Sequence, residues 1–291
     1  MIDYLRAQVV GIDTATIYQR ENLSFTQEVN TRTGELSEKL KAECKNLALE
    51  YFPTSGRMTI AGSLHKYWND GFHNFNDFAL SDLHELENRL FEDTGLRYDN
   101  LKLTRLEFGL NVQIEQEVKA ILHGSLMHLS QAPSRRDTFQ GKGEFLLFHH
   151  NRYELKLYDK GKQYKQGKGL FRFEVKHTNW TEYRLRGFQT LAEVVESALT
   201  LLRADLMKKW SEIVFFDPTN LNPSRPNYKS VSFWEELQKR SAPTRKKHRD
   251  KLKAMNATEG TDLQNRIGEA LEKKLSELMD KGGTTNERRT A

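Results

Sequence analysis

The chain has 291 residues, of which 37% are hydrophobic, and it carries a formal net charge of +5. A chain of this length can bury a large core without disulfides, and its single cysteine, Cys44, excludes an internal disulfide and any multi-cysteine metal site. No stretch approaches the roughly 18 apolar residues that a membrane-spanning helix needs, and the N-terminus lacks the apolar run of a signal peptide. We therefore expect a cytoplasmic protein that makes no contact with a membrane.

The first third of the chain predicts a sheet followed by a helix. Residues 1–70 alternate in short apolar and polar steps, separated by turn sequences such as NTRTGE and PTSGR. A helix is expected over about residues 82–93, where leucines recur at helical spacing and Gly95 follows as a stop signal.

The middle of the chain alternates between strands and helices. Residues 101–114 (LKLTRLEFGLNVQI) predict a strand, and apolar residues at helical spacing up to Leu126 predict a helix after it. Three further strands are expected at EFLLFHHN, RYELKLYDK and LFRFEVKHT. Thr190 and Glu193 then form a capping box before an amphipathic helix over roughly residues 191–213.

The C-terminal part differs in composition. The segment FDPTNLNPSRPN holds three of the six prolines and is typical of a linker, and helices are expected near residues 232–240 and 261–280. Residues 222–291 hold 16 Lys and Arg against 10 Asp and Glu, whereas residues 1–221 hold 29 against 30.

Residues 239–253 are the most basic segment, with eight basic residues and one acid. This density suits phosphate neutralisation, and a solvated, partly disordered arm would have the same composition. The residues expected to contact DNA phosphates here are Arg245, Lys246, Lys247, Arg249, Lys251 and Lys253.

Strands and helices interleave over residues 1–215, which predicts an α/β (α+β) fold with a largely antiparallel central sheet flanked by helices. The expected organisation is this domain, a linker over residues 216–231 and a helical, basic C-terminal extension over residues 232–291.

Polar residues collect on one face of three predicted strands, because side chains alternate across a strand. Each of the strands carries apolar residues on one face and acids mixed with bases on the other. The polar sets are Arg105, Glu107 and Asn111; Glu154, Lys156, Tyr158 and Lys160; and Arg172, Glu174 and Lys176. If the strands are neighbours, the carboxylates lie among the basic side chains around Tyr158.

Such a cluster suits phosphodiester chemistry. Carboxylates hold a hard divalent cation such as Mg²⁺ or Mn²⁺, and basic side chains bind the phosphate and ease the ionisation of a tyrosine. A tyrosine with its ordinary pKa near 10 is a poor nucleophile at neutral pH. The alternative is a solvated face with cross-strand salt bridges.

His65, in GSLHKYWND, is a further candidate ligand for the metal or the phosphate. The strand reading places it on one face with Ser63 and Tyr67. A lone histidine is more often neither kind of ligand. His149 and His150 do not share a strand face, so they are not the His-hydrophobic-His pair of many nicking enzymes.

Several of these segments together resemble the replication proteins of phages and plasmids that use rolling-circle replication, in particular the filamentous-phage gene II type. The segments are GSLHKYWNDGFHNFNDF, LTRLEFGLNV, YELKLYDKGKQY, LFRFEVKHTNW and SFWEEL, and they span about residues 1–255. The resemblance implies a nickase-ligase whose tyrosine attacks one strand at the origin and keeps its 5′ phosphate.

The resemblance also implies site roles. It makes Glu107 and Glu174 the best candidates for metal ligands and places Lys160 and Arg172 at the phosphate. His65 stays a further metal candidate from its own sequence context. Further DNA contacts are expected from Arg105 and Lys176, and Lys156 belongs with the catalytic group.

The nucleophile stays open at this point. Related plasmid initiators carry theirs in a Tyr-x-Gly-Ser-like context, where this chain has Phe139-Gln140-Gly141-Lys142. Tyr158 is the first candidate, Tyr153 the second and Tyr164 the third.

Three functions remain. The first is an origin-nicking enzyme that binds origin DNA and works with a host helicase. The second is a replication-associated DNA-binding protein without strand transfer, which the absent tyrosine favours. The third is a structural or protein-interaction module. Oligomeric state, preferred metal and origin sequence are not predicted.

Overall fold

The computed structural model describes residues 1–137, 143–167, 169–220 and 226–280. The chain divides into two compact units. The first unit contains Met1–Phe108, His177–Leu202 and, of the described residues, 276–280; the second contains Gly109–Lys176 and Arg203–Leu275. The segment Phe139-Gln140-Gly141-Lys142, where the sequence has no tyrosine in the expected context, lies outside the described residues.

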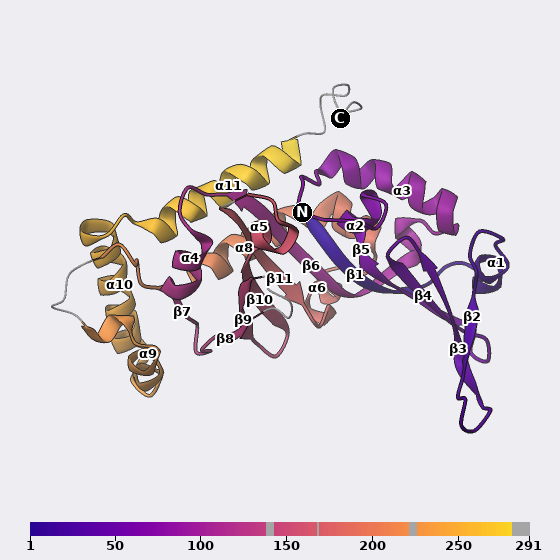
Figure 1. The fold of residues 1–291 in the computed structure, drawn as a ribbon, viewed down its shortest axis with the longest axis horizontal. Coiled ribbons are helices and arrows are strands. Elements are labelled where there is room, and N and C mark those ends of the chain that lie inside the picture. Colours follow the sequence, from indigo (N-terminus) through magenta and orange to yellow (C-terminus); the bar gives the residue numbers. More distant parts are fainter. Residues whose placement is uncertain (138–142, 168, 221–225, 281–291) are drawn as a thin grey trace. The chain divides into compact units, whose positions relative to one another are not determined.

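The first unit is built on antiparallel strands in the order β2-β3-β4-β5-β1-β6 (Figure 1). Alternate residues of β1, β4 and β5 are buried, as expected for a sheet with one face on a core. The strands are β1 (Ile2–Val9), β2 (Thr26–Val29), β3 (Leu36–Cys44), β4 (Leu47–Phe52), β5 (Arg57–Ser63) and β6 (Leu101–Gln113), of which β6 continues into the second unit.

The helix α3 of this unit confirms the sequence prediction. It buries Leu83, Leu86 and Leu90 and ends at Gly95, whose φ of 76° is the left-handed conformation that glycine adopts most easily. The helical elements of the unit are α1 (Thr14–Tyr18), α2 (Leu64–Trp68), α3 (Leu80–Thr94), η1 (Tyr98–Asn100), α6 (Thr181–Leu185), α7 (Leu191–Glu193) and η3 (Val194–Ala198).

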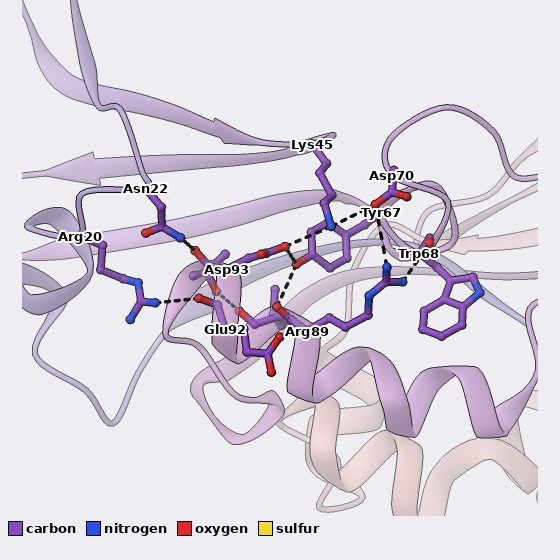
Figure 2. Close-up of polar contacts among 11 residues, drawn as sticks. Arg20, Asn22, Lys45, Tyr67, Trp68, Asp70, Arg89, Glu92 and Asp93 are labelled. Carbon is purple, nitrogen blue, oxygen red and sulfur yellow. Dashed lines mark hydrogen bonds and ion pairs between the residues drawn. The ribbon is translucent and has the colours of Figure 1, made fainter. Parts of the chain in front are cut away.

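A polar network joins α2 to the C-terminal end of α3 (Figure 2). Tyr67 donates a hydrogen bond to Asp93 at 2.5 Å, and the Lys45 ammonium lies 3.2 Å from the same carboxylate. Asn22 donates to the carbonyl of Asp93 at 2.6 Å, which satisfies a backbone group that the helix end leaves open. Burial, together with Asp93, raises the pKa of Tyr67 above its ordinary value. We therefore assign this tyrosine a structural role as a hydrogen-bond donor and do not consider it as a nucleophile.

The second unit contains the strands in the order β6-β11-β10-β9-β8 and a separate two-stranded sheet of β12 and β7. The pairings of β9 with β10, β8 with β9, and β12 with β7 are antiparallel. The strands are β7 (Ser125–His128), β8 (Ser134–Asp137), β9 (Glu144–His149), β10 (Tyr153–Asp159), β11 (Leu170–His177) and β12 (Ile213–Phe215). The expected mixed α and β fold with a largely antiparallel sheet is confirmed.

Helices cover the apolar face of β11. Trp210 of α8 lies 5.3 Å from Phe173 and 6.0 Å from Phe171, measured between ring centroids, and its indole donates to the carbonyl of Gln264 in α11. The opposite, polar face of β11 carries Arg172 and Glu174. The helical elements of this unit are α4 (Val118–Gly124), α5 (Lys160–Tyr164), α8 (Leu199–Ser211), η4 (Pro226–Lys229), α9 (Val231–Gln238), α10 (Ala242–Glu259) and α11 (Leu263–Asp280), with the first turn of α8 and the last turn of α11 in the first unit.

Two predicted helices are shorter than their apolar spacing suggested. The helix expected to reach Leu126 ends at Gly124, because the chain continues as β7, which pairs with β12. A side chain at position 124 would come within 2.6 Å of the carbonyl oxygen of Phe216. The helix expected to reach residue 213 ends at Ser211, since Ile213 begins β12.

The segment expected to be a linker contains a buried carboxylate, Asp217. Asp217 is 0% exposed and accepts hydrogen bonds from the backbone of Thr219 at 2.9 Å and from Thr261 and Leu263 at 3.0 Å. It therefore joins β12 to the N-terminal end of α11. Burial opposes its ionisation, but the hydrogen bonds outweigh burial and hold the pKa of Asp217 below the ordinary value of 3.8.

The lowered pKa of Asp217 predicts that the free energy of unfolding depends on pH. A carboxyl whose pKa is lowered by folding stabilises the folded state above its unfolded pKa, and that stability is lost as the pH falls through the folded value. Asp217→Asn is therefore expected to lower the free energy of unfolding by about 1.5–3 kcal/mol at neutral pH. The destabilisation should become smaller at a pH well below 3.8, where the carboxyl becomes protonated in the folded state too.

Urea unfolding at both pH values measures this effect. Asp250→Asn, at an exposed position of α10, is the matched control and should unfold like the wild type. Equal destabilisation by Asp217→Asn at both pH values would contradict a role of the ionised carboxylate.

Candidate functional site

The polar face of β10 and β11 carries a cluster of charged side chains around Glu174. The Arg172 Nε atom lies 2.5 Å from Glu174 Oε2, and Lys156 Nζ lies 3.4 Å from Oε1. The Tyr158 hydroxyl donates to Oε2 over 3.5 Å. The strand alternation in the sequence predicted this face, and the structure brings these four side chains together.

Lys160 completes the cluster from the first position of α5. Asp159 caps this helix by accepting a hydrogen bond from the Lys162 amide at 2.8 Å, and the chain turns so that Lys160 faces Tyr158. Lys160 Nζ donates to the Tyr158 hydroxyl at 3.2 Å and lies 4.9 Å from the ring centroid of Tyr164. An ammonium at this position stabilises a negative charge on the phenolic oxygen.

Two residues of β6 shape the cluster, and neither was assigned a role from the sequence. Asn111 accepts a hydrogen bond from Arg172 Nη1 at 2.9 Å. Gly109 lies against Glu174, whose Cβ would be 2.5 Å from any Cβ at position 109. A glycine inside a strand often marks a close approach of this kind, so Gly109 was the sequence feature that could have indicated it.

The cluster is largely closed to water. The exposed fractions are 1% for Lys160, 2% for Arg172, 3% for Glu174 and 8% for Tyr158. The side chain of Lys156 is 37% exposed and its ammonium lies 4.7 Å from the centre of the Tyr158 ring. Charges in such an environment interact more strongly than they do in water.

The end of the same face near Glu154 has the character of a solvated salt-bridge surface. Lys176 Nζ lies 3.5 Å from Glu154 Oε2, and His149 Nδ1 lies 3.0 Å from Oε1. All three side chains are between a quarter and a half exposed. The two readings of the face therefore apply to different parts of it, and Lys176 has a carboxylate partner here.

Tyr153 lies on the other face of β10. Its ring stacks on His150 with centroids 4.5 Å apart, and Lys209 Nζ lies 4.1 Å from the ring centre. Burial, and after it the carboxylates of Glu212 and Asp205, raise the pKa of Tyr153 to about 12. A tyrosine with a raised pKa is a poorer nucleophile at neutral pH, which counts against Tyr153.

His65 lies in a different setting from the one its sequence predicted. Residues 63–67 do not form a strand: Ser63 ends β5 and caps α2 by accepting from the Lys66 amide at 3.0 Å. His65 is 3% exposed, stacks on Phe78, and its Nε2 lies 2.8 Å from Asn76 Oδ1. The correction follows from the cap, since a serine that satisfies a helix N-terminus starts a helix.

The expected metal ligands do not form a suitable donor set in the described part of the chain. No group of three or more His, Cys, Asp or Glu side chains is gathered there as a metal site. Both carboxylate oxygens of Glu174 lie against cations, Arg172 and Lys156. Hard divalent cations take oxygen ligands, and basic groups at the same carboxylate compete with them. Glu107 and His65 belong to the first unit, and Glu174 to the second.

The predicted DNA contacts of α10 fall into two groups. Lys246, Lys247, Lys251 and Lys253 are exposed. Arg245 donates to the carbonyl of Arg240 at 2.7 Å, and Arg249 donates to the carbonyl of Leu129 at 2.9 Å. The arginines therefore hold α10 in place. Elsewhere, Arg105 of β6 is exposed, whereas Arg172 is buried.

Comparison with known proteins finds similarity to solved structures and none in sequence. No protein-family model and no curated protein sequence matches the chain. Among solved structures, the chain is similar to one titled "Structure of Rolling Circle Replication Initiator Protein from Geobacillus stearothermophilus". The TM-score is 0.44 with 12% sequence identity, over 81% of this chain and 94% of that one.

No helix among the described residues is long and apolar enough to cross a membrane.

Proposed function

We propose that this chain is an initiator of rolling-circle replication that nicks one strand of origin DNA with Tyr158. The observation that carries the proposal is the position of the Tyr158 hydroxyl between the Lys160 ammonium and the Glu174 carboxylate. Arg172 lies beside the same carboxylate, at 2.5 Å. A phenol between a cation and a carboxylate has both a stabiliser for its anion and an acceptor for its proton.

The reaction follows from these contacts. The Tyr158 oxygen attacks the phosphorus of one phosphodiester, and the bond from phosphorus to the 3′ oxygen breaks. The phenolic proton passes to Glu174, the leaving 3′ oxygen takes a proton from water, and the hydroxide so formed takes the proton from Glu174. Lys160 stabilises the negative charge on the phenolic oxygen before attack. The products are a 5′-phosphotyrosine and a free 3′ hydroxyl.

A divalent cation remains a prediction from the sequence resemblance. The cations around Glu174 make this carboxylate a poor ligand for Mg²⁺ or Mn²⁺, so the proposed step uses only side chains of the cluster. A dependence of nicking on metal would place the ion at other residues or on the DNA phosphate itself.

A non-catalytic DNA-binding protein is the second candidate function. Its support is the burial of Tyr158, which is 8% exposed and has its hydroxyl engaged by Lys160. An attacking oxygen must be reached by the strand, and of the cluster side chains only Lys156 is more than a third exposed. The two candidates differ in one observable, a covalent bond to DNA.

The test incubates the purified full chain with a supercoiled plasmid that carries the origin of its own element. Parallel samples contain Mg²⁺, Mn²⁺ or EDTA. We expect a protein–DNA adduct that survives denaturation, with the nucleotide remnant on Tyr158 after peptide mapping. Binding without an adduct in every sample would overturn the nicking proposal in favour of the second candidate, and a remnant on Tyr164 or Tyr153 would move the nucleophile.

A further inference from the structure

The segment α9–turn–α10 has the organisation of a helix-turn-helix. The helix α9 has eight residues and ends at Gln238, residues 239–241 form the connection, and α10 begins at Ala242. Ser241 caps α10 by accepting a hydrogen bond from the Thr244 amide, and Pro243 occupies its first turn. A short helix, a turn of this length and a longer helix are the parts of a DNA-binding helix-turn-helix.

The helices α9 and α10 belong to the second unit and pack against each other (Figure 1). Trp234 and Leu237 of α9 share a buried cluster with Leu252 and Met255 of α10. Near the turn, Arg245 of α10 donates to the carbonyls of Gln238 and Arg240. Further along, the His248 ring lies 5.5 Å from Phe233 of α9. The helix pair is therefore packed on a buried core and is not a solvated arm.

This packing decides which side of α10 is free. The buried or partly buried positions of the helix include Arg245, His248, Arg249, Leu252 and Met255, which recur at helical spacing. The exposed positions lie between them and form the opposite face. That face carries Lys246, Lys247, Asp250, Lys251, Lys253 and the small residues Ala254 and Ala257.

We propose that α10 is a recognition helix whose exposed face enters the major groove of duplex DNA, with Lys246, Lys247 and Lys251 on the phosphates at its edges. The proposal rests on the proposed role in replication, since it names the form of DNA that this element binds. The B-DNA major groove is wide enough to admit an α-helix, and lysines neutralise the phosphates that flank it. A helix held by its inner face to a rigid partner presents its outer face without an ordering cost.

Complementary charge selects DNA over other partners for this face. Its exposed charges are four lysines and one aspartate over the first three turns, and it carries no large apolar side chain that a protein partner could bury. Deletion of the C-terminal part would be a poor test, because Leu252, Met255 and the Gln264 contact to Trp210 belong to the core. Substitutions at exposed lysines avoid that problem.

The test compares two triple variants of the full chain. Lys246→Ala/Lys247→Ala/Lys251→Ala removes the exposed charge of α10. Lys119→Ala/Lys208→Ala/Lys273→Ala removes the same charge from other exposed positions of the second unit. Binding is followed by fluorescence anisotropy with a labelled random-sequence 20-base-pair duplex and with a 20-nucleotide single strand.

The α10 variant is expected to bind the duplex at least about tenfold more weakly, and the slope of log K against log salt should become shallower by about 3. The control variant should stay within about twofold of the wild type. Methyl green, which occupies the major groove, should displace the wild type from the duplex, whereas the minor-groove ligand netropsin should not.

Displacement by netropsin alone, or equal binding by both variants, would overturn the inference. An equal loss of single-strand and duplex binding would overturn it too, because the face would then bind phosphates of any geometry. These outcomes do not depend on the covalent adduct. If the chain forms the adduct but gives one of these results, the proposed function is kept and only the role of α10 in duplex binding is rejected.

Discussion

Tyr158→Phe is expected to abolish the covalent adduct with origin DNA while DNA binding is kept. The substitution removes only the attacking oxygen, which in the wild type accepts a hydrogen bond from Lys160 at 3.2 Å and donates to Glu174 at 3.5 Å. The ring stays available for its contact with the Lys156 ammonium. Loss of the hydroxyl contacts should lower the free energy of unfolding by only about 1 kcal/mol.

The measurement is adduct yield on denaturing gels, with DNA affinity measured beside it. Tyr164→Phe and Tyr153→Phe are the matched controls, since Tyr164 shares the Lys160 ammonium and Tyr153 lies on the opposite face of the same strand. Both should form the adduct. A normal adduct from Tyr158→Phe, together with its loss from Tyr164→Phe, would show that Lys160 activates the other tyrosine.

Lys160→Met offers a complementary test of activation. It keeps the length of the side chain and removes the charge, so the phenolate of Tyr158 loses its stabilising cation. We expect the adduct to form more slowly at neutral pH and to recover as the pH is raised, because the tyrosine then ionises without help. A rate reduced equally at every pH would instead indicate a loss of DNA binding.

Regular patterns predicted most of the fold. The three leucines and Gly95 marked α3, and the alternation in β6, β10 and β11 separated apolar from polar faces correctly. The errors came where a short pattern fits two structures. Residues 63–67 alternate like a strand, yet Ser63 caps a helix. The apolar spacing up to Leu126 fits a helix, yet residues 125–128 form the strand β7, which pairs with β12.

The site was predictable as a face but not as a buried cluster. Alternation placed Tyr158, Arg172 and Glu174 on one side of the sheet. Their burial depends on contacts distant in the sequence, such as Asn111, which is 61 residues from its partner Arg172. A strand pattern carries no information on what covers a polar face, so the same pattern was compatible with a solvated salt-bridge surface and with a metal site.

Glu174→Ala distinguishes these readings, and we expect it to lower the free energy of unfolding by about 3–5 kcal/mol. Arg172 is 2% exposed and keeps its charge, so removal of the carboxylate takes away the counter-charge 2.5 Å from this buried cation. Glu154→Ala is the matched control on the same face. Its partners are partly exposed, and the loss should be about 1 kcal/mol or less.

Urea unfolding gives these values, and a second variant separates charge from packing. Arg172→Leu/Glu174→Leu replaces the pair by apolar side chains and should recover most of the stability lost in Glu174→Ala, because a buried ion pair is often no more stabilising than apolar residues. It should form no adduct, since Tyr158 then lacks its proton acceptor. A stable Glu174→Ala, combined with a rise in the melting temperature of the wild type alone on addition of Mn²⁺, would contradict the ion-pair role and return Glu174 to the metal-ligand assignment.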